Sequence, residues 1–361
     1  MTSRERWLKA VAFQPLDRLP FWPKLDGAYS VAYSGQFPGK PLEEIHAWIG
    51  SDNHVFLPSC LKQTRKFTSV ETVKESGERR TLFKTSTKTL TLAEKWDGPS
   101  QSWHPVKFPV EKVEDIRVMT EVFRDCTPEP DTQAIESTKE RIKNLGESAV
   151  FASGIGTSAL MDWVERLAGV ENAVFLLFDH EKTVQDLFDA IHGVLVRACH
   201  VAAETNPADL IYLTENTSTT LISPQQYEKY NFPHIREYGD ILSKAGRRLV
   251  LHMCGKLKAL LPQLAKVPAK AFEAFTSPTL GDTTFLDGRT ACPDKCLIGG
   301  TNATLWTKSA GEIIRQIEAD LDALPHHRGI VVTSGGVMTP LCKPETVKQV
   351  CEWVKSYPPH F

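Results

Sequence analysis

The stretch RLVLHMCGKLKALLPQL, residues 248–264, has the pattern of one strand, turn and helix, and it decides the fold. Residues 248–252 form a short, mostly apolar run, which is typical of a strand that is covered on both faces in a parallel sheet. Gly255 then turns the chain, and a helix candidate covers Leu257–Lys266. The stretch therefore predicts the repeating unit of an α/β protein.

Similar apolar runs recur along the chain, and most are followed by a loop and a segment of helical period. They cover Arg18–Pro23, Asn53–Pro58, Ala149–Ser153, Asp209–Thr214, Ala271–Phe275, Cys296–Gly299 and Gly329–Thr333. The other helix candidates are Gly169–Ala203, Pro224–Lys244, Ala310–Leu324 and Pro344–Ser356. Alternation of strand and helix eight times predicts an α/β fold, a (β/α)8 TIM barrel in one domain over residues 1–361. A doubly wound open sheet is the structural alternative.

Residues 65–109 interrupt this alternation. Polar and β-branched residues alternate there on both sides of Ser76-Gly77-Glu78, which predicts an antiparallel β-hairpin insertion. On a barrel such an insertion usually covers one end, and Trp96 and Trp103 are candidates for the wall of a lid. A ribbon packed beside the barrel is the alternative.

Composition excludes several classes of partner. The formal net charge is -2, and the two signs are interspersed, so nucleic acid and anionic membranes are not expected to bind. The N-terminus lacks the pattern of a secretion signal, and no apolar run approaches the length of a membrane span. We therefore expect a cytoplasmic protein. Its eight cysteines are then expected to be buried thiols or metal ligands and not a disulfide framework.

The strongest chemical signal is His252-x-Cys254 at the end of the strand in residues 248–252. Residues two apart in an extended segment point the same way, so an imidazole and a thiolate could reach one ion. This ligand pair suits Zn²⁺, and barrel enzymes keep their active sites at the carboxyl ends of the strands. The alternative is a packed histidine beside a buried thiol.

Two further residues are candidate zinc ligands by position. Glu215 closes the strand in DLIYLTEN, and Cys342 follows the last strand in a loop shaped by glycine and proline. The alternatives are a capping or ion-paired carboxylate for Glu215 and an unligated loop cysteine for Cys342. Cys292 and Cys296 are discounted, because Cys296 begins a strand and so belongs near the opposite end of the barrel.

Aromatic and sulfur-containing side chains are frequent near the predicted rim, and together they favour an apolar substrate pocket. The candidates are Phe21, Trp22, Tyr29, Trp103, Met161, Trp306 and Met338.

Four segments carry a family resemblance: DLIYLTENTSTTLISPQQYEKYNFPHIREY, LVLHMCG, CLIGGTNATLW and SGGVMTPLCKPETVKQV. They resemble the uroporphyrinogen decarboxylase superfamily along nearly the whole chain, and the His-x-Cys element resembles its cobamide-dependent methyltransferase branch. The resemblance implies a barrel with zinc held by His252, Cys254, Cys342 and Glu215. That branch usually has its last cysteine directly after the final strand, where this chain has Gly335-Gly336 instead.

True uroporphyrinogen decarboxylases carry an arginine-rich N-terminal signature that binds substrate carboxylates. Residues 18–40, RLPFWPKLDGAYSVAYSGQFPGK, have no counterpart of it. A substrate with many carboxylates needs several cationic donors in its pocket, so this difference points away from such a substrate.

The first hypothesis is thus a zinc-dependent methyltransferase, an O-demethylase component. It would move a methyl group between a small substrate, such as a methoxylated aromatic, and the cobalt of a corrinoid (cobalamin) held by a partner protein. Asp26 and Glu273 are candidates for orienting the substrate or a proton, with Glu215 as a displaceable zinc ligand. A homodimer is a further expectation for the assembly. The alternatives are a metal-free decarboxylase and a non-catalytic protein with a structural zinc.

Overall fold

The computed structural model describes all residues, 1–361. Its central feature is an eight-stranded parallel sheet with the strand order β1-β14-β13-β12-β11-β10-β9-β2. The strands are β1 (Phe21–Lys24), β2 (Asn53–Leu57), β9 (Ala149–Thr157), β10 (Leu210–Thr214), β11 (Leu249–His252), β12 (Ala271–Phe275), β13 (Cys296–Gly299) and β14 (Ile330–Val337). All eight predicted strands are therefore confirmed, and the sheet curves into a (β/α)8 barrel.

The barrel is nearly closed, because its two edge strands, β1 and β2, meet through Asp52. The backbone N–H of Asp52 donates to the carbonyl of Phe21 at 2.8 Å, and its carboxylate accepts from the N–H of Phe21 at 3.1 Å. The ring of Trp22 on β1 then stacks on His54 of β2 with centroids 4.3 Å apart. The open-sheet alternative is excluded by this curvature.

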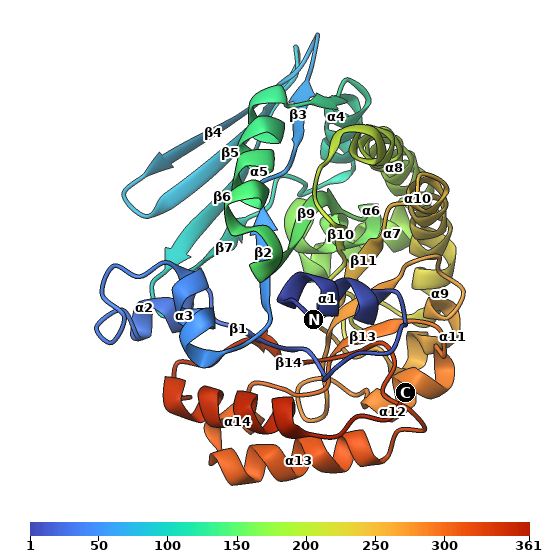
Figure 1. Ribbon diagram of the computed structural model, residues 1–361. Helices are drawn as coiled ribbons and strands as arrows, with labels where there is room; N and C mark the ends of the chain where they lie inside the picture. The colour runs from blue at the N-terminus through green and yellow to red at the C-terminus, as the bar shows by residue number, and fades with distance from the viewer.

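Helices surround the barrel (Figure 1). They are α1 (Ser3–Val11), α2 (Ala28–Ala32), α3 (Leu42–Ile49), α4 (Val113–Arg124), α5 (Thr132–Leu145), α6 (Ala159–Asp162), α7 (Val170–Asp179), α8 (Glu181–Thr205), α9 (Pro224–Gln226), α10 (Phe232–Lys244), α11 (Leu261–Leu264), α12 (Phe285–Ala291), α13 (Ala310–Asp322) and α14 (Pro344–Ser356). None of them combines the length and apolar composition needed to cross a membrane.

Two helix predictions need correction. The predicted helix Gly169–Ala203 is two helices, α7 and α8, because the backbone leaves the helical region at His180. The predicted helix Leu257–Lys266 is a 3₁₀ turn over Lys258–Leu260 followed by the short α11.

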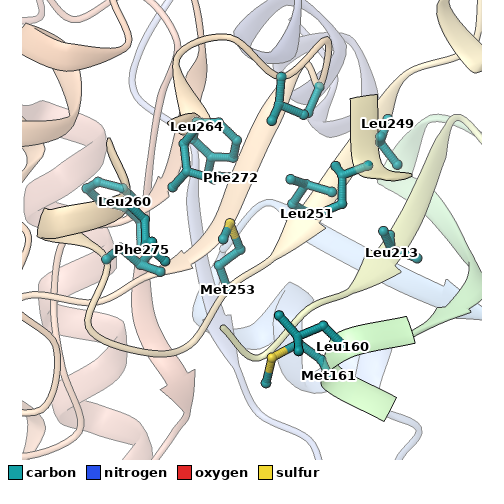
Figure 2. Close-up of a cluster of buried hydrophobic side chains, with 14 of the residues drawn as sticks. Leu160, Met161, Leu213, Leu249, Leu251, Met253, Leu260, Leu264, Phe272 and Phe275 are labelled. Atoms are coloured by element: carbon teal, nitrogen blue, oxygen red, sulfur yellow. The ribbon is translucent and has the colours of Figure 1, made fainter. Parts of the chain in front are cut away.

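Two apolar layers hold the barrel. Side chains such as Val250, Ala271 and Ile298 fill its interior together with Trp7 of α1, which covers the amino-terminal ends of the strands. The alternate residues of the same strands face the helices. Figure 2 shows this outer cluster, with Leu251 and Met253 beside Phe272. Strand parity thus decides whether a residue faces the interior or the helix layer.

The interruption at residues 65–109 is a four-stranded antiparallel sheet in the order β4-β5-β6-β7. Its strands are β4 (Ser69–Glu75), β5 (Glu78–Lys84), β6 (Thr89–Asp97) and β7 (Ser102–Lys107). The first hairpin turns at Ser76-Gly77, as predicted. A separate pair, β3 (Leu61–Thr64) and β8 (Thr127–Pro130), connects it to the barrel, and Figure 1 shows the inserted sheet beside the barrel, away from α13 and α14.

Candidate functional site

The carboxyl ends of β1, β11 and β12 bring Lys24, His252 and Glu273 together at the barrel mouth. His252 and Glu273 face each other in the register of adjacent strands, and His252 Nδ1 hydrogen-bonds to Glu273 Oε2. The other carboxylate oxygen, Oε1, lies 2.8 Å from Lys24 Nζ. The Glu273 side chain is only 2% exposed, so both of its oxygens are held in a buried network.

Mutual attraction favours the charged form of each of the three groups. Burial on its own would raise the pKa of Glu273, but Lys24 and His252 hold that pKa well below its usual range. Burial opposes protonation of His252, whereas the Glu273 carboxylate and the nearby Cys254 side chain raise the pKa of His252 to about 9. Because Nδ1 is held by Glu273, the ring orientation is fixed and Nε2 is the nitrogen left for a ligand.

Cys254 is the one exposed thiol among the eight cysteines. Its Sγ donates to Asn216 Oδ1 at 3.2 Å, and Asn216 Nδ2 donates to Glu165 Oε2 at 3.2 Å. Burial raises the pKa of Glu165 to about 6. Met253, between the two candidate ligands, is fully buried in the outer cluster of Figure 2. His252 and Cys254 are therefore on the mouth side of the chain, while Met253 anchors the segment to the core.

A cavity of about 610 Å³ opens beside this network and is lined by His252, Glu273, Lys24 and the predicted Asp26. Aromatic rings form part of its wall: Trp22, His54, Phe56 and Tyr212. His54 Nε2 and the Tyr212 hydroxyl are hydrogen-bonded at 3.1 Å, and burial lowers the pKa of His54 to about 4. The mouth thus combines a polar, charged side with an aromatic side, which suits a small organic substrate.

The backbone N–H of Glu215 donates to the carbonyl of His252 at 2.9 Å, but the Glu215 side chain faces away from the mouth. It shares the strand parity of Ile211 and Leu213, so its buried side chain faces the helix layer. Asn231 Nδ2 donates to Glu215 Oε2 at 2.5 Å, and burial raises the pKa of Glu215 to about 7.

Cys342 is also held elsewhere. Cys342 is 2% exposed, and its thiol lies close enough to Tyr29 of α2 and to Tyr33, directly after α2, to influence their hydroxyls. Burial raises the pKa of this thiol to about 12. β14 continues through Gly335-Gly336 to Val337, so Cys342 follows five residues after the strand ends.

Zinc is the ion that the sequence resemblance implies. The exposed thiol of Cys254 and the imidazole of His252, with a carboxylate on its Nδ1, fit a zinc ligand pair and its supporting group. A catalytic zinc usually has three protein ligands. No group of three or more His, Cys, Asp or Glu side chains is arranged to share one metal ion. The structure therefore provides two of the four predicted ligands together.

Of the predicted substrate-contacting residues, Trp22 lines the mouth cavity. Five others belong to the hydrophobic core: Phe21, Tyr29, Met161, Trp306 and Met338. Trp103 lies on the inserted sheet, where its ring is 5.4 Å from that of Trp96 and 4.9 Å from the guanidinium of Arg79. Neither Trp96 nor Trp103 lines the mouth cavity.

Sequence reasoning missed Lys24, Asn216 and Glu165. Lys24 directly follows the apolar residues of β1, and Asn216 follows Glu215 at the end of β10, so both were available by the same positional argument. Asn216 has a positive φ of 44°, which turns the chain there and directs its amide toward Cys254. Glu165 follows α6, and no sequence signal marked it.

The fold and the mouth define a (β/α)8 barrel protein with a histidine, a thiol and a buried carboxylate at the carboxyl ends of its strands. The sequence profile of uroporphyrinogen decarboxylase (URO-D) matches residues 98–357. The chain belongs to the uroporphyrinogen decarboxylase family.

One solved structure supports the same fold. A methyltransferase from Methanosarcina mazei has a TM-score of 0.61 and 15% sequence identity, with 99% of each chain covered. A D-psicose 3-epimerase has a TM-score of 0.33 and 11% identity, with 67% of this chain and 85% of that chain covered. No curated protein sequence matches the chain.

Proposed function

We propose that the protein is a methyltransferase that moves a methyl group between a small methoxylated aromatic compound and the cobalt of a corrinoid held by a partner protein. The observation that carries this proposal is the exposed Cys254 thiol beside the His252 imidazole, which itself lines the mouth cavity. Family membership and the barrel shared with a solved methyltransferase are compatible with it. We further propose that His252 and Cys254 hold a zinc ion.

Zinc bound to this pair would supply a Lewis acid for the substrate heteroatom. Other residues of the chain orient the two proposed ligands. Glu273 fixes the His252 ring through Nδ1, and Lys24 keeps the Glu273 carboxylate ionised inside the barrel. Asn216 orients the Cys254 thiol. These contacts fix both side chains before a ligand arrives, which lowers the cost of ordering them.

The shape and chemistry of the cavity favour an aromatic substrate. The rings of Trp22, Phe56 and Tyr212 offer flat apolar surfaces against which an arene can pack. Asp26, which is exposed at the same cavity, can accept a hydrogen bond from a substrate hydroxyl. A methyl ether on a ring would thus lie between the aromatic wall and the polar mouth.

The cavity fits a polycarboxylate poorly, which weighs against the decarboxylase alternative. Two of the cations that line it are already paired with carboxylates. Lys24 is bound to Glu273, and Arg141 is bound to Glu43. A substrate with many carboxylates would have to break these pairs, and the desolvation of the released groups is costly.

The decisive experiment measures methyl transfer to free cob(I)alamin from a panel of methoxyaromatics, methylamines, methanol and methylthiols. We expect transfer from a methoxyaromatic, bound zinc by elemental analysis, and loss of both in Cys254→Ser. A fully active, metal-free protein would exclude the zinc proposal, and absence of transfer from every donor would exclude the methyltransferase proposal.

A further inference from the structure

A second cavity, of about 640 Å³, lies between the barrel and the inserted sheet. It shares two lining residues, Phe56 and Thr214, with the mouth cavity that holds His252 and Glu273. The Phe56 ring lies over β9, where the Cβ of a residue at Gly154 would be 3.6 Å from it. Phe56 is 56% exposed although it is a large apolar residue, because it stands between these two open spaces.

The wall of this second cavity is mainly apolar. The sheet contributes Val70, Phe83 and Leu92, and helices α4 and α8 contribute further aliphatic and aromatic side chains: Val122, Ile191, Val194 and Leu195 with the adjoining Phe123. On the barrel side, Gly154 and Gly156 leave room, since a Cβ at Gly156 would lie 3.0 Å from Leu195 Cδ2. The volume is within the range of small-molecule sites.

One cation in this apolar wall has no anionic partner. Arg65 makes one side-chain hydrogen bond, from a terminal nitrogen to Gln63 Oε1 at 2.9 Å, and its buried Nε has no partner. Other arginines of the insertion are paired: Arg79 lies 2.6 Å from Glu94, and Arg80 lies 2.8 Å from Glu78. Arg65 is therefore an unpaired guanidinium beside an apolar cavity.

A second guanidinium lies at the same cavity. Arg166 lines it, and its only ion pair is a long one, with Nε 4.0 Å from Asp162 Oδ1. A planar guanidinium matches a carboxylate through two parallel hydrogen bonds, and it does so best where water is partly excluded. The lining contains one acidic residue, Asp162, which lies near Arg166, so Arg65 is the cation left for an anion attached to an apolar body.

We propose that this cavity binds an aromatic monocarboxylate, with the carboxylate on Arg65 and the ring against the apolar wall toward Phe56. The assignment of this ligand as the methyl donor rests on the proposed function. It makes the donor a methoxylated benzoate whose methoxy group extends past Phe56, which lines both cavities, into the mouth. The binding itself does not depend on that function. Arg166 is the second cation near the carboxylate.

The test measures binding of 4-methoxybenzoate and of its neutral isostere 4-methoxybenzamide to the full chain by calorimetry. We expect the acid to bind roughly 10- to 100-fold more tightly than the amide, as expected for charge-assisted hydrogen bonds. Arg65→Gln should reduce this preference by about tenfold, with Arg166 still near the carboxylate, and leave binding of the amide unchanged. The matched control is Arg80→Gln on the same insertion, which should bind like the unaltered protein. Thermal unfolding of each variant verifies that it is folded.

Equal binding of acid and amide, an undiminished preference in Arg65→Gln, or binding of neither compound would overturn the inference. Acetate extends the test, because an apolar body is required and acetate should bind far more weakly than the aromatic acid. If the protein transfers methyl groups but binds the acid no more tightly than the amide, only the inference about this cavity fails. If the protein binds the acid more tightly than the amide but transfers a methyl group from no donor, only the proposed function fails.

Discussion

Glu273 holds His252 from the neighbouring strand: its Oε2 accepts the hydrogen of Nδ1, and the two residues are register partners on β12 and β11. Lys24 occupies the other carboxylate oxygen at 2.8 Å. The imidazole that we assign to zinc therefore depends on a buried ion pair, and this pair can be altered without touching either proposed ligand.

Glu273→Gln should weaken zinc binding by roughly 10- to 100-fold, because the neutral amide holds the imidazole less firmly and lowers its basicity. The same change leaves Lys24 charged and unpaired inside the barrel, which should cost about 3 kcal/mol of unfolding free energy. Competition with a chromophoric chelator measures zinc affinity, and urea unfolding measures stability.

The control for this change is the double variant Lys24→Met, Glu273→Gln. It removes the unpaired charge, so it should be more stable than Glu273→Gln alone while its zinc affinity stays low. If zinc affinity recovers along with stability, Glu273 supports the fold of the mouth and does not tune His252.

Counting the zinc ligands gives the second prediction. Zinc should be lost in His252→Gln and Cys254→Ser and retained in Glu215→Gln and Cys342→Ser. Glu215 faces Asn231 in the helix layer, and Cys342 is buried near Tyr29. Elemental analysis after gel filtration provides the stoichiometry. Loss of zinc from a folded Cys342→Ser protein would instead mean that the loop after β14 closes over the site and restores the four-ligand set.

His252 and Cys254 lie together as predicted from the sequence, whereas Glu215 and Cys342 do not join them. This contrast shows how far the structure could be predicted from the sequence. The strands were predictable because each apolar run, such as Ala271–Phe275, is a local signal of a doubly covered strand. However, that signal does not indicate which residues of the strand face the barrel interior and which face the helices. In DLIYLTE both faces of the strand are apolar, so nothing local indicates that Tyr212 faces the interior and Glu215 the helices. The ligand role predicted for Glu215 depended on that missing information.

Loop positions were less predictable for a different reason. Cys342 is buried near Tyr29 of α2, which is about three hundred residues earlier in the chain. Lys24 and Asn216 acquire their roles from partners on other strands. By contrast, the His252-x-Cys254 spacing is an extended local geometry, and the sequence was sufficient to place both side chains at the mouth.

Gly255 supports the third prediction, because it fixes the segment that carries Cys254. A Cβ at this position would lie 2.2 Å from the carbonyl oxygen of Thr217 and 2.4 Å from Ser218 Cβ. The obstacle includes backbone, so Gly255→Ala must displace the segment, at a cost of about 1–3 kcal/mol. We expect reduced zinc content at near-normal folding. Gly98→Ala, at an exposed turn with nothing within 4 Å, is the matched control and should change neither quantity. Unchanged zinc content in Gly255→Ala would show that the pair tolerates a shifted loop.

The last prediction concerns acid stability and His46, which is 2% exposed on α3 and hydrogen-bonded through Nδ1 to Ser51 Oγ at 2.8 Å. Burial lowers the pKa of His46 to about 3, while an unfolded histidine has a pKa near 6.5. Between these two pH values the unfolded chain binds one more proton at this position. The free energy of unfolding should therefore fall as the pH falls, by up to about 1.4 kcal/mol per pH unit for this group.

His46→Asn keeps a hydrogen-bonding group for Ser51 and removes the titration. Urea unfolding between pH 7 and pH 4 should show a smaller dependence of the unfolding free energy on pH in this variant, equivalent to the uptake of about one proton fewer on unfolding. His54 should still contribute to this dependence, because its pKa is lowered to about 4. His104→Asn, at an exposed position on β7, should keep the slope of the unaltered protein. An identical slope in His46→Asn would mean that acid reaches His46 without unfolding α3. The buried imidazole would then not limit stability below pH 6.5.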